Sequence, residues 1–100
     1  MAEYKVIYSP KLWQRLNDLL SYLSTNWGIK VADDFLFVFE QKMNLLMMNP
    51  KIGRLSSKRR GIRSISITKH NRVYYQVKKD TIIIATLFDT RQHPSKNKFE

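Results

Sequence analysis

The sequence contains no cysteine, and it has only eight acidic residues, three glycines and three prolines among its 100 positions. Without cysteine the chain has neither a disulfide framework nor a thiolate metal site, which fits a reducing compartment such as the cytoplasm. The longest uninterrupted apolar run, Phe35 to Phe39, is far too short to span a membrane. The N-terminal residues lack the apolar core of a secretory signal peptide. We therefore expect a small soluble domain in the cytoplasm.

The shortage of acidic residues is confined to the second half of the chain. Residues 1–50 hold five basic and five acidic side chains, whereas residues 51–100 hold thirteen basic and three acidic ones. The formal net charge of +10 therefore comes entirely from the second half. An asymmetry of this kind indicates an anionic partner for that half.

The size and composition predict one folded domain over residues 1–100. A hydrophobic fraction of 43% with twelve aromatic residues is too high for a disordered chain. About 100 residues is the usual size of a single domain, large enough to bury roughly two-thirds of its unfolded surface.

The first half of the chain predicts a strand followed by two helices. Residues 4–8 are rich in β-branched and aromatic side chains, which is typical of a strand. Ser9 and Pro10 then form a helix start, with serine as the N-cap and proline at the first helical position. A break at residues 26–28 joins this helix to a second one over Ile29 to Met48, which ends before Pro50. The apolar stripe of the second helix consists of Ala32, Phe35, Phe39, Met43 and Leu46.

The second half predicts three strands joined by two hairpins, over residues 62–68, 72–77 and 81–89. In the second of these strands, alternation places Val73, Tyr75 and Val77 on one side and Arg72, Tyr74 and Gln76 on the other. The predicted fold is therefore a two-layer α+β domain of order β-α-α-β-β-β. It has an N-terminal strand, a helical hairpin and a three-stranded antiparallel meander, with one sheet face packed on the helices and the other face free.

From Lys51 to Arg72 the chain has eight basic residues and no acidic one. Five of the eight are arginines, which form bidentate pairs with phosphate or carboxylate groups. The pattern indicates contact with nucleic acid or with an acidic protein segment. The candidate binding residues are Arg54, Lys58, Arg59, Arg60, Arg72 and Tyr74.

Catalytic motifs are scarce. The sequence has no Gly-rich loop, no set of metal ligands at the usual spacings and no nucleophile beside a base, so we expect neither a metal nor a cofactor. Metal-independent RNA cleavage remains compatible, because the 2′-hydroxyl is the nucleophile and the protein supplies only proton transfer and cations. Its candidate residues are Arg63, Arg91 and His93, with Arg54 and Arg72 as further cations. Tyr74 and Tyr75 are weaker proton-transfer candidates.

Five short segments together resemble the RelE/ParE superfamily of bacterial type II toxins. They are Tyr4-Lys5-Val6-Ile7-Tyr8-Ser9-Pro10, Asn49-Pro50-Lys51-Ile52-Gly53, Ile62-Arg63, Arg72-Val73-Tyr74-Tyr75, and Leu87-Phe88-Asp89-Thr90-Arg91-Gln92-His93-Pro94. The resemblance covers residues 4–99 and implies a growth-inhibiting toxin of a plasmid stabilisation-like system. It also implies a cognate antitoxin, assembly as a toxin–antitoxin heterotetramer, and no membrane partner. A toxin homodimer is compatible as well.

The resemblance implies two different activities. RelE-like members cut messenger RNA on the ribosome, and Arg63 and Arg91 match their basic positions. ParE-like members bind DNA gyrase without cleaving nucleic acid. RelE-like enzymes usually have a Tyr or His in the C-terminal tail, where this chain reads Ser95-Lys96-Asn97-Lys98-Phe99. His93 could substitute for that residue, but the Arg-x-x-Pro pattern from Arg91 to Pro94 is more typical of ParE-like sequences. The resemblance therefore favours the ParE-like activity, with a ribosome-dependent nuclease and a non-toxic nucleic-acid-binding module as the alternatives.

Overall fold

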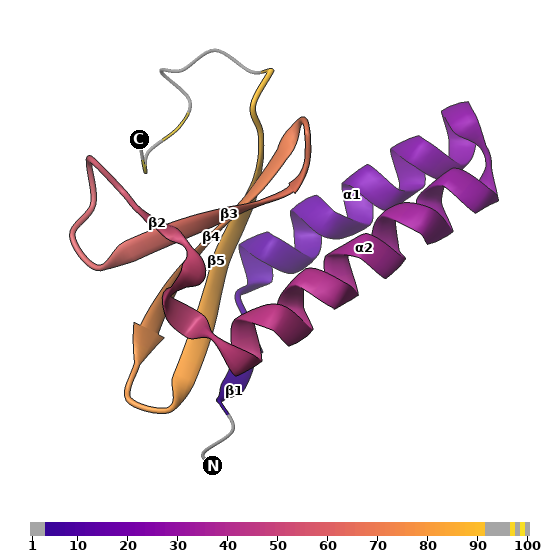
Figure 1. Ribbon diagram of the computed structural model, residues 1–100. Helices are drawn as coiled ribbons and strands as arrows, with labels where there is room; N and C mark the ends of the chain where they lie inside the picture. The colour runs from indigo at the N-terminus through magenta and orange to yellow at the C-terminus, as the bar shows by residue number, and fades with distance from the viewer. Residues whose placement is uncertain (1–3, 92–96, 98, 100) are drawn as a thin grey trace.

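A helical hairpin lies against one face of a five-stranded sheet in the computed structural model, which describes residues 4–91, 97 and 99 (Figure 1). The elements in chain order are β1 (Lys5–Tyr8), α1 (Pro10–Trp27), α2 (Ile29–Met48), the 3₁₀ helix η1 (Pro50–Ile52), β2 (Arg54–Leu55), β3 (Ile62–Thr68), β4 (Asn71–Lys78) and β5 (Thr81–Asp89). The α+β class and the helical hairpin are confirmed. No helix within the described ranges is long and apolar enough to cross a lipid bilayer.

The sheet differs in detail from the one that the sequence predicted. Its strand order is β1-β5-β4-β3-β2, and β3, β4 and β5 form the expected antiparallel meander. The N-terminal strand β1 runs parallel to β5, so the sheet is mixed. The two-residue strand β2 extends the other edge by pairing with β3. Neither pairing was predicted, because each depends on contacts between segments that local alternation does not connect.

The start of α1 follows the predicted capping pattern. The Ser9 side chain accepts a hydrogen bond from the backbone N–H of Leu12 at 3.0 Å, and Pro10 occupies the first helical position. The same hydroxyl donates to the carbonyl oxygen of Ala85. Ser9 therefore caps the helix and ties its first turn to β5.

The main hydrophobic core lies between the helices and the sheet. The five residues of the predicted α2 stripe are all buried, and Leu12 and Leu16 of α1 face them. The sheet contributes inward-facing residues at alternate positions, including Val73 and Tyr75 of β4, which are both 0% exposed. This confirms the predicted faces of β4.

A second, smaller cluster covers part of the opposite sheet face. Ile62, Tyr74 and Phe88 are buried there, and Phe99 from the C-terminal tail packs against them. This face was expected to be free. It is instead partly covered, because the tail supplies an aromatic ring to an apolar patch that would otherwise be in water.

Candidate nucleic-acid and partner interface

The connection between β2 and β3 carries the densest group of cations. Lys58, Arg59 and Arg60 follow one another there, and all three are exposed. The Ser56 hydroxyl organises this connection by accepting the backbone N–H groups of Lys58 at 3.1 Å and Arg59 at 3.0 Å. Hydrogen bonds between a serine side chain and nearby backbone N–H groups stabilise a turn where the chain forms neither helix nor strand. The turn therefore presents three adjacent positive charges on a defined backbone.

Arg72 lies on the sheet face opposite the helices, as alternation predicted. Its Nε donates to the Ser64 hydroxyl and its Nη1 to the Ser66 hydroxyl, each at 2.8 Å. Ser66 pairs directly with Arg72, and Ser64 pairs with Tyr74 on one side and Arg54 on the other. These pairings place Arg54, Arg72 and Tyr74 on one face of the sheet.

Arg63 lies on the other face, with the core. Its Nη1 donates to the carbonyl oxygens of Gly53 at 2.8 Å and Lys51 at 3.2 Å. A charged side chain is tolerated here because β3 begins at the rim of the core, where the guanidinium reaches the turn after α2. The sequence suggested Arg63 and Arg72 as cations of one candidate site, but the structure places them on opposite faces of the sheet.

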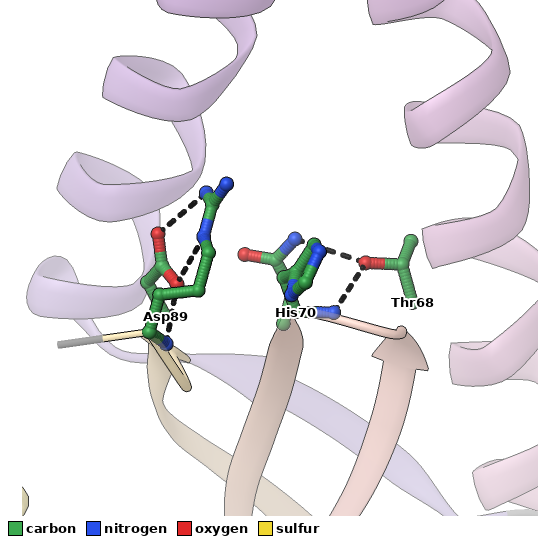
Figure 2. Close-up of polar contacts among 5 residues, drawn as sticks. Thr68, His70 and Asp89 are labelled. Carbon is green, nitrogen blue, oxygen red and sulfur yellow. Dashed lines mark hydrogen bonds and ion pairs between the residues drawn. The ribbon is translucent and has the colours of Figure 1, made fainter. Parts of the chain in front are cut away.

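Arg91 lies just beyond β5 in an ion pair with Asp89. Its Nη2 lies 2.8 Å from Oδ2 of Asp89, and its Nε and backbone N–H both donate to Oδ1. These hydrogen bonds hold the pKa of the Asp89 carboxyl below its usual value. Figure 2 shows Asp89, His70 and Thr68 at the ends of adjacent strands, with His70 between the other two. His70 lies in the turn between β3 and β4.

A groove opens between this end of the sheet and the far part of the helical hairpin. Its volume is about 410 Å³, and its walls are mainly apolar. Tyr22 and Trp27 of the hairpin are 54% and 67% exposed beside it, and Arg91 lies at its polar side. An apolar groove with exposed aromatic side chains beside it suits the apolar face of an amphipathic segment.

Of the three predicted catalytic residues, the structure describes Arg63 and Arg91, and these two do not pair with the same part of β4. Arg63 pairs with Tyr75 of β4. Arg91 lies two residues after Asp89, which pairs with Asn71 of β4. Those two β4 positions are four residues apart, or roughly 13 Å at the usual rise of a strand. His93 lies outside the described residues. The described residues also contain no group of three or more side chains able to hold a metal ion.

Residues that the sequence analysis did not single out complete the basic face. Ser64 and Ser66 orient Arg72, and Phe99 and Asn97 contact Tyr74. The alternating serines of β3 were a usable signal, since they lie opposite the core positions. Phe99 was signalled only by being a lone aromatic residue in a polar tail.

Known structures share this arrangement of elements. A chromosomal ParDE toxin–antitoxin system from P. aeruginosa matches with a TM-score of 0.74 and 15% identity, covering 87% of this chain and 96% of that one. The isolated E. coli RelE toxin matches with a TM-score of 0.61 and 13% identity, covering 93% of this chain and 90% of that one. The YoeB dimer from Staphylococcus aureus matches with a TM-score of 0.60 and 17% identity, covering 87% of this chain and 97% of that one. No curated protein matches by sequence.

The fold is that of the RelE/ParE superfamily of type II toxins, as the sequence resemblance predicted. Within it, the family model described as the ParE toxin of the type II toxin–antitoxin system parDE matches residues 6–94. The chain belongs to this ParE toxin family.

Proposed function

We propose that this protein inhibits bacterial growth from the cytoplasm by binding DNA gyrase, and that a cognate antitoxin neutralises it. The observation that carries the choice of target is the separation of Arg63 from Arg91 along the sheet. Phosphoryl transfer on RNA requires cations and proton donors held around a single phosphate. Here one guanidinium is engaged with turn carbonyls and the other with Asp89. Binding a protein target requires no such convergence.

Two surfaces support an antitoxin partner. The eight basic residues from Lys51 to Arg72 are accompanied by no acidic residue, so an acidic segment would relieve their mutual repulsion. The groove beside Tyr22 and Trp27 would take the apolar face of the same partner. Solved complexes with a similar fold include the heterotetrameric YoeB–YefM toxin–antitoxin complex from Staphylococcus aureus. We infer a toxin–antitoxin heterotetramer for this chain as well.

Inducible expression of the chain alone tests toxicity, and co-expression of candidate antitoxin genes from its genomic neighbourhood tests neutralisation. The expected result is growth arrest that co-expression of the antitoxin relieves. No arrest at high protein level would contradict the toxin assignment and would favour a simple nucleic-acid-binding module.

The target is tested with purified protein in two parallel assays, gyrase supercoiling and messenger RNA cleavage on programmed ribosomes. We expect inhibition of supercoiling without cleavage, and we expect the His93→Ala variant to remain toxic. Ribosome-dependent cleavage that disappears in His93→Ala would instead establish the RelE-like nuclease.

A further inference from the structure

The C-terminal tail places an aromatic ring on the basic face of the sheet. The Phe99 ring stacks on Tyr74 with a centroid separation of 5.0 Å and an interplanar angle of 18°. The guanidinium carbon of Arg59 lies 5.3 Å from the centroid of the same ring. Phe99 therefore contacts both a tyrosine ring and a guanidinium, which are two surfaces that attract a flat π-system.

Polar contacts hold the tail at this position. Nδ2 of Asn97 donates to the Tyr74 hydroxyl at 2.9 Å, and Nζ of Lys58 donates to the Asn97 carbonyl oxygen at 3.2 Å. The Ser56 hydroxyl donates to the Phe99 carbonyl oxygen. The basic connection between β2 and β3 therefore hydrogen-bonds to the backbone of Asn97 and Phe99, while Tyr74 stacks on the Phe99 ring.

The surroundings of the ring are suited to phosphate groups. Lys58, Arg59 and Arg60 lie on the adjacent connection, and Arg72 lies on the same sheet face as Tyr74. Proteins that bind single-stranded nucleic acid combine these two features, an aromatic platform for the base and cations along the backbone. An acidic peptide would satisfy the cations, but it has no general need for a stacking platform.

We propose that Tyr74 and Arg59 form a base-binding site for single-stranded nucleic acid, which Phe99 occupies within the same chain. In the described structure Tyr74 is only 1% exposed, so a base stacks there when Phe99 withdraws. Phe99 thus acts as an intramolecular competitor that keeps the site closed. This binding activity is separate from the proposed gyrase inhibition and is measured without it.

The test is the binding of purified protein to a fluorescein-labelled single strand of about 12 nucleotides, a length within the range that such sites cover. We expect Phe99→Ala to bind uridylate or thymidylate strands at least tenfold more tightly than the unaltered chain. An abasic strand of equal length and charge should show no such gain. Phe37→Ala is the matched control, because it removes an exposed aromatic ring from α2, where 60% of the residue is in solvent.

Further variants assign the gain to the two proposed surfaces. In the Phe99→Ala background, Arg59→Gln and Tyr74→Leu should each remove most of the gain, with thermal unfolding confirming that both variants fold. Equal binding by the unaltered chain and Phe99→Ala would overturn the proposal. An equal gain for the abasic strand would also overturn it, because the site would then recognise phosphate alone. Displacement of Phe99 by an acidic aromatic peptide, without any gain for nucleic acid, would assign the site to a protein partner and overturn it as well.

Discussion

The Tyr75 hydroxyl accepts a hydrogen bond from the backbone N–H of Gly53 at 2.9 Å and donates one to the Pro50 carbonyl oxygen at 2.7 Å. Tyr75 lies in the centre of β4 and is fully buried, so this pair joins the turn after α2 to the middle of the sheet. Burial raises the pKa of the phenol, which stays neutral and can therefore act as donor and acceptor at once. Tyr75 therefore holds the turn from the sheet, and Arg63 holds the same turn through the carbonyl oxygens of Lys51 and Gly53.

Replacing Gly53 with alanine should destabilise the protein by about 2 to 3 kcal/mol. An added Cβ would lie 2.8 Å from Cε1 and 2.9 Å from Cζ of the Tyr75 ring, closer than real contacts allow. Either the turn or the ring must then move, and both are packed. Urea unfolding monitored by circular dichroism measures the change.

Gly61→Ala is the comparison for Gly53→Ala. Its nearest non-neighbouring atom would be 3.7 Å away, so its cost comes from the positive φ of 80° and not from a clash. If Gly53→Ala lowers the free energy of unfolding no more than Gly61→Ala does, the turn can move to accommodate the added Cβ, and the predicted clash is refuted.

Removing only the hydroxyl, in Tyr75→Phe, should lower the free energy of unfolding by about 1 to 3 kcal/mol. The ring still fills its place in the core, but the N–H of Gly53 and the carbonyl of Pro50 each lose a partner. A buried polar group without a partner costs more than an average hydrogen bond contributes. Tyr22→Phe provides the control, because that hydroxyl is on an exposed helix position and its loss should change stability little. Equal unfolding midpoints for the two variants would contradict the argument.

Arg63→Ala should reduce stability by about 1 kcal/mol, because the turn carbonyls of Lys51 and Gly53 lose a charged donor at a partly exposed site. Arg63→Lys should recover only part of this loss, since an ammonium lacks the fixed fork of a guanidinium. Thermal unfolding of both variants, beside Arg60→Ala in the exposed turn, provides the measurement. Equal unfolding temperatures for Arg63→Ala and Arg60→Ala would refute the structural role of Arg63. If the expected loss is seen, reduced activity in Arg63→Ala is not by itself a sign of catalysis.

Local signals in the sequence predicted the helices closely. The second helix spans Ile29–Met48 as expected, because Gly28 and the pair Asn49-Pro50 interrupt helical geometry whatever surrounds them. The parallel pairing of β1 with β5 could not be predicted in this way. Those strands are far apart in sequence, and only the packed helical hairpin brings them together.

The candidate site was predictable in composition but not in arrangement. The run of cations located the basic connection, and alternation placed Arg72 and Tyr74 on the same face. Alternation along β3 places Arg63 on the same side as Ile65 and Ile67, although its charge had made it a candidate cation of the catalytic site. The structure resolves this conflict through the turn carbonyls that Arg63 reaches, which no local pattern reveals. The contact of Phe99 with Tyr74 is similarly long-range.

The ion pair of Asp89 and Arg91 predicts a specific dependence of stability on pH. Hydrogen bonds from Arg91 lower the pKa of Asp89 in the folded state relative to the unfolded state. The carboxylate therefore stabilises the fold above its unfolded pKa, roughly 4, and this contribution is lost as the pH falls through the lower folded value. Because the Arg91 side chain is largely in solvent, we expect this contribution to be small.

The measurement compares Asp89→Asn with the unaltered chain by urea unfolding across the acid range, together with an NMR titration of the Asp89 carboxyl carbon. The stability difference should be present at neutral pH, shrink below about pH 4 and diminish in high salt. Asp34→Asn is the control, since its carboxylate forms only an exposed helical pair with Lys30, which contributes little to stability. A difference between Asp89→Asn and the unaltered chain that grows as the pH falls would reverse the sign and refute the role of Arg91. So would an Asp89 carboxyl that titrates above the usual value.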